Sequence, residues 1–295
     1  MSTGILGRVQ RRAAKLRRSA VSAVVTPQLA ARSARSDRSL IDASNPVVVS
    51  LTSYGQRLDT VHLTIESIGR GDSRPARLIL WTDPGVVTSA LSPELRRQMG
   101  RGLEILPSPA CYGPHTKYFP YVSSVERHSS PLVTADDDSI YPRWWLRRLQ
   151  NAATRNPDEV VCYRAHRVAI DSDGVIARYN SWGAVRGVEA SVLNFATGVS
   201  GVHYPAEFLM RLKEDGDRFL MCTPRADDVW LHSRAVAHGF EIRQIVRSPI
   251  KFPEIASTQE VALHLGNTGR SANDTQIAAT YDEAVRTALR AAAAR

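Results

Sequence analysis

The sequence predicts an α/β fold in which helices flank a mostly parallel central sheet. Short apolar runs rich in β-branched residues alternate with amphipathic segments from residue 46 to residue 155, a pattern typical of parallel strands joined by helical crossovers. The 295 residues are 43% hydrophobic and 23% charged, which is an ordinary globular composition. No apolar stretch approaches the roughly 18 residues that a membrane-spanning helix needs.

Each element has a local signal. Val47–Leu51 is a continuous apolar run, as expected of a strand buried on both faces. Ser92 is suited to cap a helix that has Pro93 in its first turn. Pro120 is expected to interrupt a helical segment. The predicted strands up to residue 155 are 47–51, 77–83, 103–107 and 131–138, and the predicted helices are 60–69, 92–99, 115–128 and 142–155. Strands and loops follow, then a helix at 226–240, a strand at 241–246 and an alanine-rich C-terminal helix.

The positive charge is concentrated at the N-terminus. Residues 1–40 hold nine arginine and lysine residues against Asp37 alone, so they carry +8 of the chain's net charge of +9. Residues 1–45 are therefore predicted to be a basic tail, and residues 46–295 a single catalytic domain. The nearly neutral body argues against a nucleic-acid partner. The tail, with Ile5, Leu6, Val9 and Leu16 at roughly helical spacing, is compatible with an amphipathic helix on an anionic membrane surface, a disordered arm or a targeting peptide.

Three cysteines, Cys111, Cys162 and Cys222, stand far apart and form no metal-binding spacing. A reducing, cytoplasmic compartment is the simplest expectation. If the tail binds lipid, the protein would be peripheral at the inner face of the cell membrane.

The segment "LVTADDDSIYPRWW" places Asp136, Asp137 and Asp138 where a buried strand ends. Ligands of open α/β sheets bind at the carboxyl ends of the strands. If the extended conformation persists, Asp136 and Asp138 point one way and Asp137 the other. Converging carboxylates repel unless a cation joins them, so a hard divalent ion is a natural partner. The alternative is an acidic loop that caps the following helix.

Taken in order, several segments resemble the GT-A fold of nucleotide-sugar glycosyltransferases, close to the family-2 type of bacterial polysaccharide synthesis. The similarity covers about residues 46–280. It is carried by "VVVSLTSYGQRLDTVHLTIESI", "LILWTDPG", "TADDDSIYP" and "CTPRADDVWL". The resemblance implies a Rossmann-like catalytic domain with an acceptor-side C-terminal portion.

The resemblance also assigns residues to the donor. Asp136 and Asp138 would hold Mn²⁺ or Mg²⁺ against the diphosphate of a UDP or GDP sugar. The residues implied to contact the donor itself are Thr52, Tyr54, Asp83, Lys117, Asp136 and Asp137. Simpler explanations exist for several of them: strand termination for Thr52 and Tyr54, a turn for Asp83, and an ordinary surface lysine for Lys117.

The catalytic base implied by the resemblance is Asp228, which would deprotonate the acceptor hydroxyl in an inverting transfer, while Asp227 would bind the acceptor. Both aspartates also suit the N-terminus of a helix. His264 is a third metal ligand by resemblance, or a structural histidine. Gly201, with Gly198, would let the backbone approach a sugar, or simply form a tight turn.

The predicted function is therefore transfer of a sugar to a glycan or lipid-linked acceptor. Two alternatives use the same residues differently. A metal-dependent phosphotransferase or nuclease would use the aspartate cluster as a two-metal site. A non-catalytic nucleotide-sugar-binding protein would have lost the chemistry.

Overall fold

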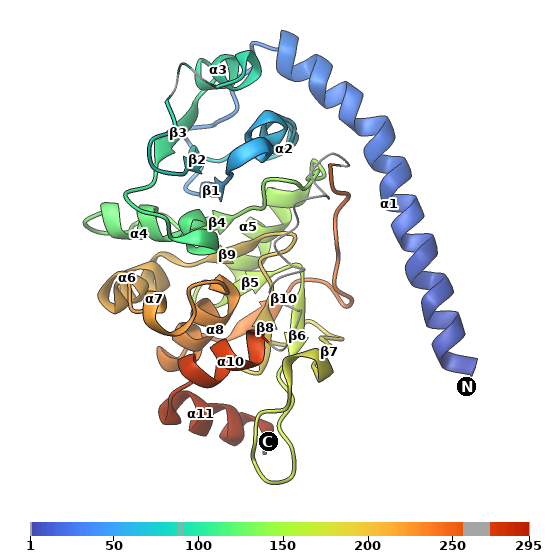
Figure 1. Ribbon diagram of the computed structural model, residues 1–295, viewed down its shortest axis with the longest axis vertical. Coiled ribbons are helices and arrows are strands. Elements are labelled where there is room, and N and C mark those ends of the chain that lie inside the picture. The colour runs from blue at the N-terminus through green and yellow to red at the C-terminus, as the bar shows by residue number, and fades with distance from the viewer. Residues whose placement is uncertain (1, 88, 90, 256–271, 295) are drawn as a thin grey trace.

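The computed structural model describes residues 2–87, 89, 91–255 and 272–294, and Figure 1 shows their arrangement. The main sheet has seven strands in the order β10-β5-β9-β4-β1-β2-β3. Its strands are β1 (Val48–Thr52), β2 (Arg77–Thr82), β3 (Leu103–Pro107), β4 (Leu132–Thr134), β5 (Val160–Cys162), β9 (Val202–Tyr204) and β10 (Ile242–Gln244). Only β9 runs antiparallel to its neighbours. This confirms the predicted α/β class, and the arrangement is consistent with a GT-A, Rossmann-like sheet.

Helices cover both faces of this sheet, which explains why its central strands β1, β2 and β4 are largely apolar. Val49 of β1 lies between Leu78 and Val133 of the neighbouring strands, and all three side chains are fully buried. Burying one such side chain contributes about 1.5–3 kcal/mol. One face packs against α2 (Val61–Gly69), α3 (Pro93–Met99) and α5 (Trp145–Arg155). The other packs against α4 (Phe119–Ser124), α6 (Ala206–Asp215) and α8 (Asp227–Ala237).

Two segments differ from the predicted elements. Residues 115–128 were expected to form one interrupted helix, but a 3-10 turn, η3 (Gly113–Lys117), precedes α4, and Pro120 lies in the first turn of α4. Proline is tolerated there because the first amide groups of a helix have no intrahelical acceptor. Strand β4 ends at Thr134, before the aspartates. Ser92 caps α3 as predicted, because its side chain accepts a hydrogen bond from the backbone amide of Leu95. Helix α6 is not among the predicted elements.

A smaller sheet lies beside the main one. It has the order β7-β6-β8, formed by β6 (Ala165–Arg167), β7 (Gly183–Ala184) and β8 (Asn194–Ala196). Its core side chains, including Trp182 and Phe195, pack with those of α8, α10 (Ala272–Thr280) and α11 (Glu283–Ala293). Helix α8 therefore packs against both sheets, since its residues contribute to both cores. The short elements η1 (Gly55–Asp59), η4 (Tyr179–Ser181) and α7 (Phe219–Cys222) complete the chain.

The basic N-terminal segment forms one long helix, α1 (Ser2–Arg35), whose N-terminal end lies away from the body in Figure 1. Its C-terminal half packs on the domain, where Leu29 is fully buried. The buried carboxylate of Glu66 anchors α1 to the domain. Arg32 Nε of the helix lies 2.8 Å from Glu66 Oε1, and Arg101 Nη1 of the domain lies 2.7 Å from Glu66 Oε2. Leu16 stays 67% exposed. Among the described residues, no helix has the length and apolarity to cross a bilayer.

Candidate active site at the carboxyl edge of the sheet

The aspartates that follow β4 meet polar residues that follow β1, because the two strands are parallel neighbours. Asp137 accepts a 2.7 Å hydrogen bond from Ser53 Oγ. Arg57, from η1, places Nη2 2.7 Å from Asp137 Oδ1 and 2.6 Å from Asp138 Oδ2. A single guanidinium thus bridges two adjacent carboxylates.

The expected alternation of the three carboxylates does not occur, since the chain turns after β4 rather than continuing as a strand. Asp137 and Asp138 share Arg57, whereas Asp136 contacts Lys117 instead. Asp137 is the buried member, and the side chains of Asp136 and Asp138 keep 21% and 18% exposure. The two carboxylates predicted to bind metal are therefore the two that solvent reaches.

Lys117, at the end of η3, connects this group to helix α8. Its Nζ lies 2.9 Å from Asp136 Oδ1 and 3.6 Å from Asp227 Oδ2. Burial alone would lower the pKa of Lys117, but the charges of Asp136, Asp227 and Asp228 raise it well above its ordinary value. The ammonium is thus held charged among three carboxylates that come from distant parts of the sequence.

Asp228 is fixed by the backbone of the turn before β9. The amide of Gly198 donates a 2.8 Å hydrogen bond to Asp228 Oδ1, while Oδ2 makes no hydrogen bond with the residues that the structure describes. A Cβ at position 198 would lie 3.1 Å from Asp228 Oδ1 and 3.4 Å from Lys117 Nζ. A larger residue would therefore press on Asp228 and displace it by a few tenths of an ångström.

Burial and neighbouring charges raise the pKa values of one acid at each end of the site. Burial, and then the charge of Asp227, raises the pKa of Asp228 to about 8 against the opposing effects of Lys117 and the Gly198 amide. Burial, and then Asp136 and Asp137, raises the pKa of Asp138 to about 7, although Arg57 opposes this. Negative charge therefore exceeds what the two cations neutralise.

The fit of a divalent cation follows from these donors. Among the described residues, no three histidine, cysteine, aspartate or glutamate side chains form a metal cluster. Asp136 pairs through one oxygen with Lys117, and Asp138 through one oxygen with Arg57. The second oxygen of each has no side-chain partner among the described residues. Mg²⁺ and similar ions are commonly held by one or two carboxylates together with substrate phosphates and water. These residues suit that mode of binding.

Other predicted site residues have more local contacts. Thr52 Oγ1 donates to the carbonyl of Trp81, and the ring of Tyr54 lies 5.9 Å from the Arg57 guanidinium carbon. Asp83 is exposed at the end of β2. Gly201 has φ +96°, and a Cβ there would lie 2.7 Å from the Trp145 ring, so the close approach it permits is to that indole. Their roles in substrate binding stay predictions. His264 lies outside the described residues.

Sequence reasoning missed Arg57 and Ser53. Both lie just beyond β1, in the segment "SYGQRLD". The signal was available, since a basic side chain at the carboxyl edge of the strand next to an acidic run is a candidate partner for that run. It also missed Tyr141, whose hydroxyl accepts a hydrogen bond from the backbone amide of Asp136.

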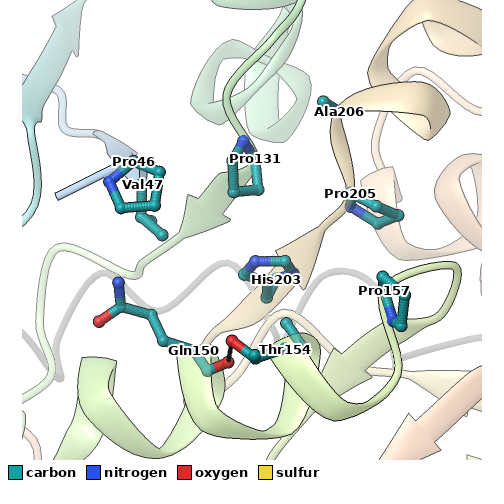
Figure 2. Close-up of a pocket in the computed structure, with 10 residues that line it drawn as sticks. Pro46, Val47, Pro131, Gln150, Thr154, Pro157, His203, Pro205 and Ala206 are labelled. Carbon is teal, nitrogen blue, oxygen red and sulfur yellow. Dashed lines mark hydrogen bonds between the residues drawn. The ribbon is translucent and has the colours of Figure 1, made fainter.

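A cavity of about 270 Å³ lies away from this site (Figure 2). Its lining includes Val47, just before β1, and Pro131, which precedes β4. It is therefore at the edge of the sheet where these strands begin, opposite the aspartates. His203 lies among its lining residues, and burial lowers the pKa of this imidazole to about 4.

Comparisons with known proteins give a fold likeness and little else. A scan against models of protein families finds no match, and a search of curated proteins finds none. Among solved structures, the chain is similar to the crystal structure of GalNAc-T7 with UDP, GalNAc and Mn²⁺, at 12% sequence identity and a TM-score of 0.47. The match covers 67% of this chain and 41% of that one, so it spans less than half of that protein.

We expect Asp228→Asn to remove a pH-dependent loss of stability. The pKa of Asp228 rises from an ordinary 3.8 to about 8 on folding, so the wild-type free energy of unfolding should fall as pH increases through that interval. Asparagine does not titrate. The variant should therefore match wild type near pH 4 and be more stable above pH 8 by several kcal/mol, at about 1.4 kcal/mol for each unit of the shift. Urea unfolding across this range measures the difference, with the exposed Asp217→Asn as control; equal pH slopes for wild type and Asp228→Asn would contradict the expectation.

Proposed function

We propose that this protein is an inverting glycosyltransferase that moves a sugar from a nucleoside-diphosphate sugar, with UDP or GDP, to a glycan or lipid-linked acceptor. One observation carries the proposal. Lys117 brings the acidic segment after β4 and the acidic start of α8 into a single site at the carboxyl edge of the sheet. Sugar transfer needs groups that neutralise a departing diphosphate and a base that activates a hydroxyl, and this site has candidates for both.

The chain's own residues suit the donor side. The Lys117 ammonium and the Arg57 guanidinium are held charged beside Asp136 to Asp138, where they would attract the diphosphate. Asp136 and Asp138 would hold Mn²⁺ or Mg²⁺, which when bound would compensate charge on the leaving nucleoside diphosphate. Asp137, buried against Ser53 and Arg57, would keep its neighbours in place.

The acceptor side centres on Asp228. Its Oδ1 is held by Gly198, which leaves Oδ2 to accept the proton of an acceptor hydroxyl. A pKa near 8 makes this carboxylate a stronger base than an ordinary aspartate. Asp227, with Oδ2 3.6 Å from Lys117 Nζ, would couple the base to the donor side.

Turnover of Asp228→Asn tests the proposed chemistry. We expect kcat to fall by about 10²–10⁴, the usual contribution of a positioned general base, while donor affinity hardly changes. Release of UDP or GDP from a panel of nucleotide sugars measures this, and NMR should show an inverted anomer in the product. Asp217→Asn, exposed and remote from the site, is the control. Normal turnover in Asp228→Asn would refute the role, and polynucleotide cleavage instead of sugar transfer would favour a nuclease.

Donor binding tests the proposed metal site. Asp138→Asn should abolish the Mn²⁺-dependent part of UDP or GDP affinity, because the neutral amide lacks the negative charge with which a carboxylate attracts a hard cation. Calorimetric titrations with and without Mn²⁺ give the two affinities, and circular dichroism checks the fold. Asp59→Asn, at an exposed position of η1, serves as the matched control. The metal role is wrong if Asp138→Asn retains the full effect of Mn²⁺.

We also propose that α1 holds the enzyme at an anionic membrane on the cytoplasmic side. The exposed basic residues Arg12, Lys15 and Arg17 would each contribute about 1 kcal/mol near such a surface. The full chain should sediment with anionic liposomes at low salt and be released as salt screens the attraction. The Arg12→Gln, Lys15→Gln, Arg17→Gln triple variant should bind less than a control with Arg127, Arg155 and Arg247 replaced by glutamine. Equal sedimentation of the two variants would exclude this role for α1.

A further inference from the structure

The small sheet presents two basic side chains next to each other. Arg164 directly precedes β6, and His166 and Arg167 are successive residues of the strand, so the side chains of His166 and Arg167 project to opposite faces. Arg164 Nη2 lies 3.2 Å from His166 Nε2, and Arg164 Nη1 lies 3.4 Å from Thr197 Oγ1. Burial, and then the charge of Arg164, lowers the pKa of His166. The imidazole is therefore neutral, and its Nε2 can accept a hydrogen bond from the guanidinium.

This guanidinium has no counter-ion within the described chain. The three arginines that the fold buries in the described chain each have a carboxylate within reach: Arg57 and Arg101 contact one at 2.7 Å or less, and Arg234 lies 3.7 Å from Asp215 and from Asp282. Arg164 is also partly buried, yet within the described chain its guanidinium contacts a neutral hydroxyl and an imidazole. A partly desolvated cation oriented by neutral groups is a suitable receptor for an anion, because binding adds the missing charge.

The cluster adjoins the candidate base. The carbonyl of Arg164 accepts the amide of Thr197, and the next amide, that of Gly198, binds Asp228. The Tyr179 ring lies 5.9 Å from the His166 ring. Burial raises the pKa of Tyr179 to about 12, and the charges of Asp228 and Arg164 act on it in opposite directions. Tyr179 is therefore near both groups, where its ring could pack against a sugar.

We propose that Arg164, supported by His166 and Thr197, binds an oxyanion carried by the acceptor, either a carboxylate or a phosphate, beside the hydroxyl that Asp228 deprotonates. This inference rests on the proposed function and deepens it, because it assigns the acceptor to the anionic sugars. The planar fork of a guanidinium matches both oxyanions with two parallel hydrogen bonds. A neutral acceptor would leave the guanidinium unpaired, so the site would favour anionic acceptors over neutral ones.

The test uses the isotopically labelled full chain and three probes: glucuronate, glucose 6-phosphate and neutral glucose. Binding is read by NMR from the Gly198 amide and the Arg164 Nε–H, which report on this site and not on donor turnover. Wild type should bind at least one anionic probe about tenfold or more tightly than glucose, and the probe that binds identifies carboxylate or phosphate as the source. Arg164→Gln should lose this preference. Arg167→Gln, on the opposite face of β6, should keep it.

Two results would overturn the proposal. One is that neither anion shifts the two resonances of wild type at about 20 mM, where a site of millimolar affinity would be nearly filled. The other is that Arg164→Gln keeps the full preference. Arg164→Lys, which retains charge without the fork, should keep only part of it and guards against misfolding of the glutamine variant. Nucleotide affinity is measured separately: its absence counts against the proposed function, whereas its presence without anion preference counts against this inference alone.

Discussion

The candidate site depends on one interaction, the placement of the Lys117 ammonium among the carboxylates of Asp136, Asp227 and Asp228. These carboxylates come from segments far apart in the sequence and would repel one another in a partly buried space. A single cation lets the carboxyl end of β4 and the start of α8 approach. Gly198 completes the contact, because a Cβ at this position would lie tightly against Asp228 Oδ1, at 3.1 Å.

The site nevertheless keeps more negative charge than its cations neutralise, and this excess links structure to function. Burial raises the pKa values of Asp138 and Asp228, and this excess adds to the effect, in keeping with the proposed roles of metal ligand and general base. Such an arrangement opposes folding at high pH, as expected of functional groups whose charges are brought together. Arg57 limits the cost by pairing with Asp137 and Asp138. Arg164 is different, since it carries charge for which the described chain has no carboxylate.

The sequence alone determined the fold class and the edge of the sheet where the candidate site lies. Continuous apolar runs such as Val47–Leu51 require cover on both faces, and regular alternation with helices requires parallel strands. Because parallel strands end at the same edge, the acidic run after β4 was predicted to lie at the carboxyl edge of the sheet, and the structure places it there beside the residues that follow β1. Ser92 was identified as a cap from local chemistry alone. These predictions succeed since they depend on residues close in sequence.

The tertiary structure decided everything that depends on pairing across the chain. Strand alternation failed for Asp136 to Asp138 because its period applies only within a strand, and β4 ends at Thr134. The bridge from Arg57, the amide of Gly198 and the fastening of α1 by Glu66 all join residues distant in sequence. No local pattern encodes such contacts. They arise because burial removes water from charged and polar groups, and each group must then find its partner wherever the fold brings one within reach.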